Sequence, residues 1–382
     1  MNIFKKILSG DKKFLIMTIV ILALGILFLA SASSIMGYRL HQDSYFFVKR
    51  QIFWIILGAV AFLITAVKPL ASWRNWAGWA LLASFILLIA VFIPGLRVEF
   101  GTSRSWVQLG SSFFVFQPSE IVKLSFLIYL SAWLSSRRKL AHDLREGIIP
   151  FFVVLGTIVV LLLLEPDTGS VVIIGGIALG VYFLSGAHIK IFLTTIGMGL
   201  FALLILMQFS SYRANRILTF LDSSRDPQGA GYHIQQSLIG IGSGGLFGQG
   251  LGKSLQKHLF LPRTEDDSIF SVIGEEMGFF ITAGFLFLLM FWLLRAYRIA
   301  SLAPPGFERN LVMGIVIWLS FQSFINIGAM LSLVPMTGVT LPLISYGGSS
   351  MLINLTALGM IYNVSRHYPL AGARLEKREA KR

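Results

Sequence analysis

The sequence predicts an all-α integral membrane protein with about ten transmembrane helices and one long extracytoplasmic loop between helices seven and eight. Hydrophobic residues make up 55% of the 382-residue chain and charged residues only 13%, which is too apolar for a soluble protein. The apolar residues also fall into repeated stretches of roughly 18 or more, each long enough to cross a hydrocarbon core of about 30 Å as a helix. A transmembrane β-barrel would instead alternate polar and apolar residues.

The predicted helices follow from the apolar stretches in chain order. The first stretch, Phe14 to Ile35, contains Ala30-Ser-Ala32, which resembles a signal-peptidase site. It is too long for a typical signal sequence and opens a series of spans, so we treat it as a helix. The ten predicted helices cover residues 14–35, 47–67, 76–95, 117–135, 149–165, 169–186, 189–208, 268–295, 309–333 and 343–364.

The positive charges predict the orientation. With a cytoplasmic N-terminus, about 20 Lys and Arg lie in inner segments and about 11 in outer ones, many of the latter in one long loop that the positive-inside rule weights weakly. Residues 1–13 and 365–382 are therefore predicted to be cytoplasmic tails of a single membrane domain, with helices one to seven in 14–208 and eight to ten in 268–364. The net charge of +14 resides in these clusters, so nucleic acid is not an expected partner.

The long loop, residues 209–267, is the only sizeable segment outside the predicted spans. A loop of this length is either functional or disordered. Tyr212, Tyr232, Leu238 and Ile239 are apolar anchors, and the run Gly240-Ile-Gly-Ser-Gly-Gly-Leu-Phe-Gly-Gln-Gly-Leu-Gly252 permits tight turns. These residues favour an ordered loop.

Charged side chains inside a span cost about 2.5–3.5 kcal/mol on insertion scales, so each is a functional candidate. Gln117-Pro-Ser-Glu-Ile-Val-Lys123 opens the fourth helix from its outer end, with Glu120 and Lys123 on one face. The two either neutralise each other, or Lys123 faces an outward cavity and binds an anionic head group or a carboxylate from another helix. Asp167, in the outer turn Glu165-Pro-Asp-Thr-Gly169, lies at a compatible depth, so we expect an Asp167–Lys123 contact.

Two groups of carboxylates lie near the outer end of the eighth helix. Glu275 and Glu276 point about 100° apart, and capping of a neighbouring loop explains them at least as well as catalysis. Glu265, Asp266 and Asp267 stand at the outer water interface, where acidic residues ordinarily complement a helix N-terminus. A functional site is the alternative, and its location supports it, because the same face also collects Arg104, Lys123, Asp167, Arg213 and Arg216.

The stretch Leu341-Pro-Leu-Ile-Ser-Tyr-Gly-Gly-Ser-Ser350 indicates irregular backbone at membrane depth. Such backbone is tolerated where it is buried in protein or lines a wet cavity. Close helix packing through small residues explains the same stretch equally well.

Two other patterns carry no chemistry. Gly240-x-Gly242-x-x-Gly245 has the residue pattern of a dinucleotide-binding motif. No parallel-sheet unit surrounds it, so we do not predict dinucleotide binding. The chain has no cysteine, and His233 and His258 have no ligand spacing around them, so we predict no metal site and no cofactor. A requirement for divalent cations stays open.

Several motifs together form a recognisable pattern. They are Phe116-Gln-Pro-Ser-Glu120, Glu165-Pro-Asp-Thr-Gly169, Asp226-Pro-x-Gly-x-Gly-Tyr232, the glycine-rich run, Ile273-Gly-Glu-Glu-Met-Gly278 and Ile344-Ser-Tyr-Gly-Gly-Ser-Ser350. With them the chain resembles the SEDS family (shape, elongation, division and sporulation proteins) from Ser31-Ala-Ser-Ser34 to the last span. Gly250-Leu-Gly-Lys-Ser-Leu-Gln-Lys257 and Thr340-Leu-Pro-Leu-Ile-Ser345 are more similar to the division branch, FtsW, than to the elongation branch, RodA.

The resemblance implies a peptidoglycan glycosyltransferase that polymerises lipid II on the outer face of the cytoplasmic (inner) membrane, with inversion and release of polyprenyl diphosphate. The family's essential aspartate follows Leu-Pro and four further residues and precedes Phe-Ile-Phe. It matches Asp267, with Ser268 where phenylalanine is usual. A carboxylate base is what a sugar hydroxyl nucleophile needs. Asp266 and Glu265 stay alternative bases, because a slip of one residue in this match is possible.

The other candidates have binding or supporting roles. A departing diphosphate needs fixed positive charge, and Trp106 either packs on a sugar face or the lipid or is an interfacial anchor. The cations available for binding are Arg104, Lys123, Arg213 and Arg216. The supporting residues are Glu120, Asp167, Glu275, Glu276, Ser345 and Ser349.

The resemblance also implies partners: a class B penicillin-binding protein transpeptidase, other membrane proteins of the divisome, and membrane lipids. Two other functions stay open. A lipid II flippase or other transporter would need a polar path across the bilayer, whereas the charged candidate residues lie mostly on the outer side. A non-catalytic scaffold would tolerate substitution of the carboxylates.

Overall fold

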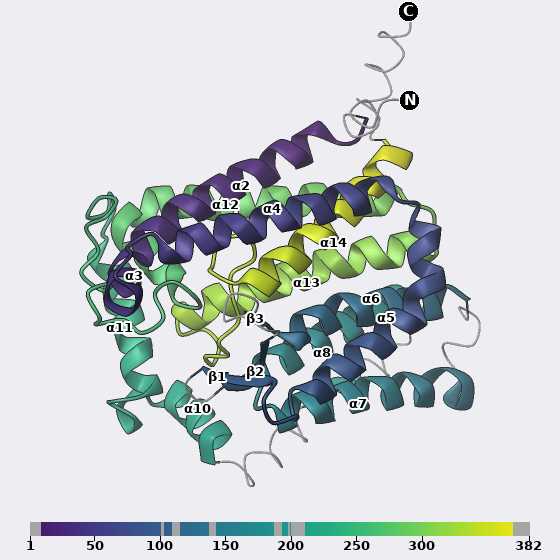
Figure 1. Ribbon diagram of the computed structural model, residues 1–382, viewed down its shortest axis with the longest axis horizontal. Coiled ribbons are helices and arrows are strands. Elements are labelled where there is room, and N and C mark those ends of the chain that lie inside the picture. The colour runs from purple at the N-terminus through teal and green to yellow at the C-terminus, as the bar shows by residue number, and fades with distance from the viewer. Residues whose placement is uncertain are drawn as a thin grey trace, which may run out of the picture.

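The computed structural model describes residues 9–100, 103–108, 115–136, 143–186, 193–197, 199 and 211–369. In these residues the fold is a bundle of long helices with one small sheet (Figure 1). The chain ends of the bundle meet, because Asp11 N–H donates to Ser365 Oγ (3.0 Å) and Arg366 Nε donates to Ser9 Oγ (3.3 Å). We call this the terminal end of the bundle, and the opposite end, where α3 and α11 lie, the loop end.

The described helices account for most of the chain. They are α2 (Lys12–Ala32), α3 (Ser34–His41), α4 (Phe46–Val67), α5 (Leu70–Ala90), α6 (Pro118–Ser136), α7 (Ile149–Leu164) after a π-helical turn (Leu144–Ile148), α8 (Thr168–Leu184), α10 (Ser211–Leu221), the 3₁₀ turn η2 (Ser223–Arg225), α11 (Ala230–Ser243), α12 (Ile269–Leu302), α13 (Phe307–Met330) and α14 (Gly348–His367). Six of these segments are long and apolar enough to cross a membrane: α2, α4, α5, α7 with its preceding turn, α12 and α13. The fold is therefore that of an all-α, multi-pass membrane protein.

The predicted helices agree with this structure except at their ends. Helix α5 begins at Leu70 rather than at 76, because its first turns are too polar to stand out, and α14 begins only at Gly348, after Pro342 and Gly347. Helix α12 continues to Leu302. Most of the predicted span 189–208 lies outside the described residues, so the total of about ten spans stays a prediction.

A small antiparallel sheet was not predicted. Strands β1 (Arg97–Phe100), β2 (Ser103–Gln108) and β3 (Val115–Phe116) pair in the order β1-β2-β3, with Val98 opposite Trp106 and Val107 opposite Phe116. The strands are short, so the alternation of their polar and apolar residues did not distinguish this segment from a loop. The sheet leads directly into α6.

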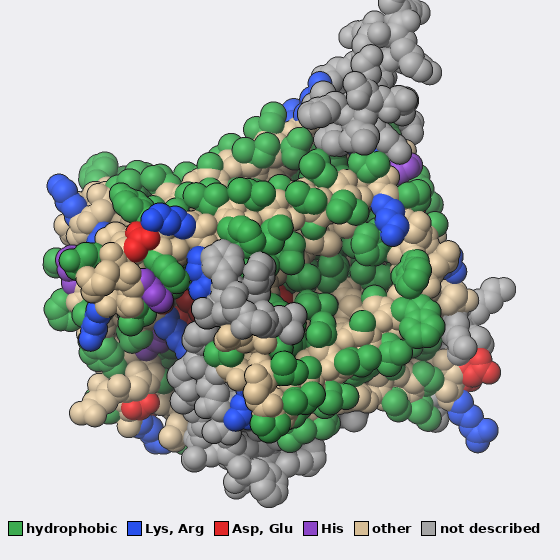
Figure 2. All heavy atoms as spheres, viewed as in Figure 1, with side chains coloured by type: hydrophobic (Ala, Val, Ile, Leu, Met, Phe, Trp, Pro, Cys, Tyr) green, Lys and Arg blue, Asp and Glu red, His purple; other side chains and the backbone are tan. Residues whose placement is uncertain are grey.

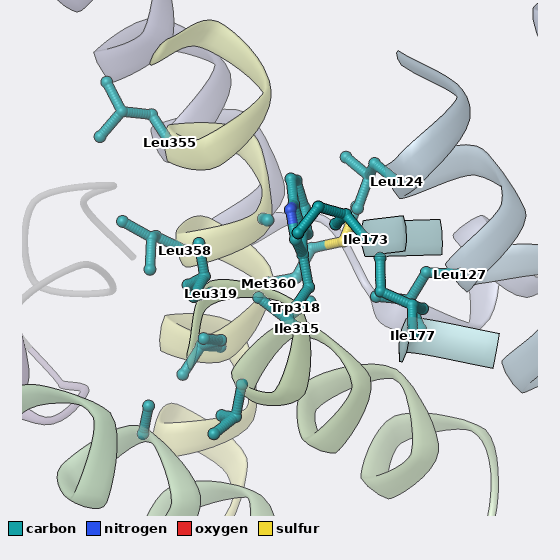
Figure 3. Close-up of a cluster of buried hydrophobic side chains, with 14 of the residues drawn as sticks. Leu124, Leu127, Ile173, Ile177, Ile315, Trp318, Leu319, Leu355, Leu358 and Met360 are labelled. Atoms are coloured by element: carbon teal, nitrogen blue, oxygen red, sulfur yellow. The ribbon is translucent and has the colours of Figure 1, made fainter. Parts of the chain in front are cut away.

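The core forms around α13. In its most apolar window 72% of the residues are buried, against 22–33% in the other five spanning segments, so α13 is surrounded by protein. Figure 3 shows side chains from α6, α8, α13 and α14 meeting in this core. On the outer surface of the molecule, apolar side chains cover the middle of the visible face, and most charged ones lie toward its two ends (Figure 2).

Helices α4 and α14 lie close together although they are almost 300 residues apart in sequence. Small residues allow the approach: a Cβ on Gly348 would lie 2.2 Å from Trp54 Nε1, and one on Gly359 would lie 2.0 Å from Thr65 Oγ1. Thr65 Oγ1 also donates to the carbonyl of Thr356 (3.0 Å) across the contact.

The segment between α13 and α14, residues 331–347, is irregular, and we call it the connector. Side-chain amides hold its backbone. Gln51 Nε2 donates to Ser345 O (3.0 Å), Gln322 Nε2 to Thr340 O (2.9 Å) and Asn326 Nδ2 to Val339 O (2.8 Å). Residues 341–345 of the connector are buried in protein, and its backbone is hydrogen-bonded by α4 and α13, which is one of the alternatives that the sequence allowed.

Candidate functional site

Asp267 lies at the loop end, two residues before α12. Its side chain is 8% exposed, and its backbone carbonyl accepts a hydrogen bond from Asn326 Nδ2 (2.9 Å) on α13. Gly338 of the connector faces it: with a φ of 73° it has the left-handed backbone that favours glycine, and a Cβ there would lie 3.6 Å from Asp267 Oδ2. The backbone of Asp267 is thus fixed to α13, and its carboxylate lies near the connector at Gly338.

Two residues absent from the predicted site lie beside Asp267. Ser268 Oγ is 3.4 Å from Asp267 Oδ1 and 2.5 Å from His233 Nε2 of α11. Burial lowers the pKa of His233, the nearby Asp267 carboxylate opposes this, and Arg263 and Arg216 lower it further. No local spacing in the sequence connects this histidine with the aspartate, because the two are 34 residues apart.

The two neighbouring carboxyl groups are half-buried and incompletely hydrogen-bonded. Asp266 Oδ1 and Glu265 Oε2 are buried without a hydrogen-bond partner among the described residues. Burial raises the pKa of both carboxyl groups; the charge of Asp267 adds to the rise in each, and Arg263 opposes it. A raised pKa favours the protonated form of these two side chains relative to an ordinary carboxyl group.

The predicted Asp167–Lys123 contact is wrong. Lys123 is 2% exposed, and its Nζ donates to Glu120 Oε1 (2.7 Å) and to Gln322 Oε1 (3.2 Å). Glu120 is the nearer carboxylate because it lies three residues away on the same helix face. Trp318 lies beside the ammonium group, with its ring centroid 5.4 Å from Nζ. The internal ion pair, the other alternative from the sequence, is the one observed.

Asp167 instead joins the N-termini of two helices. Its Oδ1 accepts from Ser170 N–H (3.0 Å) and caps α8. Its Oδ2 accepts from Ser119 Oγ (2.8 Å) in the first turn of α6 and from Gln117 Nε2 (3.1 Å) just before that helix. Gln117 N–H in turn donates to Ser349 Oγ (2.9 Å) at the start of α14. Lys123 is not among the hydrogen-bond partners of Asp167.

Glu275 and Glu276 cap the loop that follows α11. Glu275 accepts from Ser254 Oγ and from Leu255 N–H (2.9 Å). Glu276 Oε1 accepts from Ser31 Oγ (2.6 Å) and pairs with Lys257 Nζ (3.0 Å), and all three side chains are buried. This is the capping arrangement that the sequence left open. Ser345 has a similar local role, since its Oγ accepts from Leu341 N–H (2.9 Å) in the connector.

The remaining candidates are only partly described. The side chains of Arg104 on β2 and Arg213 on α10 lie outside the described residues. Trp106 pairs opposite Val98 in the sheet and is half-buried. Arg216 Nη1 donates to the connector carbonyl of Met336 (3.2 Å) and is near enough to His233 to affect its pKa.

Two side-chain amides were also missed. Gln322 and Asn326 lie four residues apart on one face of α13 and contact Lys123, the connector and Asp267. In the sequence, two amide side chains four residues apart in an otherwise apolar helix were the available sign of a polar contact there. In the part of the chain that the structure describes, no three His, Cys, Asp or Glu side chains gather as metal ligands.

Taken together, these residues form a carboxylate site at one end of a helix bundle. Asp267 has a histidine and a hydroxyl beside it, Arg216 and Arg263 act on the same histidine, and two half-buried carboxyl groups precede it. Such a site can accept a proton from a hydroxyl nucleophile while nearby cations stabilise an anionic leaving group.

Comparison with known proteins agrees with this fold. The FtsW/RodA/SpoVE family model, described as "Cell cycle protein", matches residues 12–369. Stage V sporulation protein E of Bacillus subtilis is 37% identical over 94% of this chain and 98% of its own length, and the probable peptidoglycan glycosyltransferase FtsW of Aeromonas salmonicida is 36% identical over 97% and 93%.

Two solved structures are also similar. A chain from a study of the structural coordination of polymerization and crosslinking by a peptidoglycan synthase complex superimposes with a TM-score of 0.76 and 28% identity, over 94% of this chain and 98% of that one. Thermus thermophilus rod shape determining protein RodA gives a TM-score of 0.70 with 29% identity over 94% and 98%. With its fold, its site and this family match over most of its length, the chain belongs to the FtsW/RodA/SpoVE family, the SEDS proteins.

Proposed function

We propose that the protein is a peptidoglycan glycosyltransferase that polymerises lipid II, with Asp267 as the catalytic base. The observation that carries this proposal is the Asp267 carboxylate itself, held at the loop end by α13 and the connector beside His233. Relatives that bear the name of this activity, and a neighbour from a peptidoglycan synthase complex, support the same reaction.

In the proposed step, Asp267 takes the proton from the 4-hydroxyl group of one lipid II sugar. The freed oxygen bonds to the anomeric carbon of the other chain with inversion, and the bond from that carbon to the lipid diphosphate breaks. Arg216 and Arg263, with Arg104 and Arg213 as further candidates, stabilise the negative charge of the leaving diphosphate. Lys123 is buried and paired, so we assign it a positioning role through Gln322 and the connector.

We further propose the cellular setting. The loop end faces away from the cytoplasm of the inner membrane, both chain ends face the cytoplasm, and the role is septal wall synthesis in cell division. The several relatives named FtsW favour division over the elongation branch. A class B penicillin-binding protein is the expected partner in crosslinking, supported by the similar chain from a peptidoglycan synthase complex. Other divisome membrane proteins are expected partners as well.

The test is glycan polymerisation from purified lipid II with the cognate transpeptidase present. We expect Asp267→Asn to lower the rate by about a hundredfold or more, the usual range for loss of a general base, whereas Asp266→Asn and Glu265→Gln keep most of it. Thermal unfolding checks that each variant is folded. Loss of activity in Asp266→Asn alone would move the base by one residue.

The runner-up function is a lipid II flippase, and the same preparations distinguish it. If wild type made no polymer in proteoliposomes but moved a fluorescent lipid II across the bilayer, the transporter would replace the enzyme. If all three carboxylate variants supported polymer synthesis at the wild-type rate, the protein would act as a scaffold for another polymerase.

A further inference from the structure

The glycine-rich loop, residues 244–252, has no part in the proposed reaction, yet it presents large apolar side chains. Phe247 is 80% exposed and Leu246 57% exposed. Beside them on α12, Phe279 and Phe280 are also exposed, and the Phe247 and Phe280 ring centroids are 5.6 Å apart. This exposed patch is continuous with the apolar surface of α12.

The loop is fixed to α12 by backbone hydrogen bonds where that helix is interrupted. Gly278 has a φ of 68° and a ψ of −176°, which breaks the helical ladder. Phe279 N–H and Phe280 N–H then donate to Gly245 O (2.9 Å) and Leu246 O (3.2 Å) of the loop, and Gly250 N–H donates to Glu276 O (2.9 Å). The position of Leu246 and Phe247 along α12 is therefore fixed at the level of Phe280.

Two polar contacts mark the limits of the apolar span on α12. At the loop end, Ser31 near the end of α2 bonds Glu276, and at the terminal end, Asp11 just before α2 pairs with Arg295 (2.7 Å). From Phe279, just past the break, to Arg295 the helix rises about 24 Å, which fits within the hydrocarbon thickness of about 30 Å. Phe280 is the second residue of this uninterrupted segment and follows Glu276 by four residues.

We propose that Leu246 and Phe247 insert into the acyl-chain region of the leaflet at the loop end, so that the glycine-rich loop is a membrane-embedded wedge. Its occupant is lipid, because the patch continues the lipid-facing surface of α12 and lies on the hydrocarbon side of Glu276. Lys253, exposed just after the wedge, is placed to reach lipid phosphates. Buried Lys257, paired with Glu276, holds the return of the chain at the interface.

The absence of cysteine from the chain permits a direct test. Phe247→Cys, labelled with an environment-sensitive fluorophore, is reconstituted as the full chain in vesicles that contain phosphatidylcholine with a nitroxide near the top of its acyl chain. Ile281→Cys, exposed on α12 one residue beyond Phe280, is the lipid-facing control, and Asp222→Cys, exposed after α10, is the water-facing control. Leu246→Cys repeats the measurement at a second wedge position.

We expect both wedge positions to show blue-shifted emission and a loss of fluorescence to the nitroxide comparable with that at Ile281→Cys. Emission and quenching like those of Asp222→Cys would overturn the proposal, since the loop would then lie in water. Blue-shifted emission without nitroxide quenching would also overturn it, because protein rather than lipid would cover the patch.

Discussion

At the scale of single residues, one buried carboxyl group lacks hydrogen-bond partners for its side chain among the described residues. Glu165, at the turn between α7 and α8, is 1% exposed, and neither of its side-chain oxygens has a hydrogen-bond partner among the described residues. Burial raises its pKa to about 9, and the nearby Asp167 carboxylate adds to the rise. The folded protein therefore favours the protonated acid at this position.

This environment predicts a pH dependence of stability. The folded pKa of Glu165 lies above its ordinary value of 4.5, so the folded state holds a proton that the unfolded chain releases. The unfolding free energy of the wild type should fall as pH rises between those values, by on the order of 1 kcal/mol per pH unit from this group. Glu165→Gln, always neutral, should lose less thermal stability than wild type between about pH 5 and pH 8.

The control for this measurement is Glu146→Gln, because Glu146 is exposed on the π-helical turn before α7. It should leave the slope of melting temperature against pH unchanged. If Glu165→Gln kept the wild-type slope, Glu165 would be ionised in the folded protein, and a cation or water would have to satisfy it.

At the scale of elements, α12 consists of two parts with different roles, one on each side of Gly278. The turns before Gly278 carry the caps for the glycine-rich loop, and the 24 residues from Phe279 to Leu302 are long enough to span the bilayer alone. A Cβ on Gly278 would lie 2.2 Å from the backbone nitrogen of Gly248. The break in α12 therefore depends on Gly278 and Gly248, whose backbones are in contact.

A substitution at this break has a matched control in the same helix. Gly278→Ala combines a strained positive φ with a backbone clash, and we expect it to lower the unfolding free energy by roughly 2 kcal/mol or more. Gly284→Ala meets open space within a regular helix and should be neutral or stabilising by up to about 1 kcal/mol. Thermal unfolding of both variants in detergent checks this, and equal melting temperatures would show that the break tolerates a side chain.

The sequence was a good guide to elements and a poorer one to contacts. Hydropathy located the described spans because each must hide its backbone from lipid. It could not show the break at Gly278, which depends on a loop about 30 residues earlier in the chain. For the site, the Leu-Pro spacing led to Asp267, but not to His233, whose neighbourhood depends on how α11 packs. The wrong partner for Lys123 arose because depth alone does not identify which side chains meet.

At the scale of the whole molecule, the orientation across the membrane is a prediction from positive charge. Ser224, on the 3₁₀ turn of the long loop, and Ser301, at the far end of α12, are both exposed. In intact cells, a membrane-impermeant maleimide should label Ser224→Cys and should label Ser301→Cys only after the membrane is opened. The cysteine-free wild type gives the background, and the reverse labelling pattern would place the site in the cytoplasm.

The pairing of α4 with α14 also bears on how the protein is made. Helices enter the bilayer in the order of synthesis, so α4 waits without its main neighbour until almost the whole chain has been translated. Helix α14 is not among the six segments apolar enough to span unaided, and its glycines fit the surface of α4. Helix α14 therefore packs onto a surface that α4 already presents in the membrane. Gln51 can bind the carbonyl of Ser345 only after the connector has been synthesised, so a chain that stops before the connector has neither the helix pair nor the buried site.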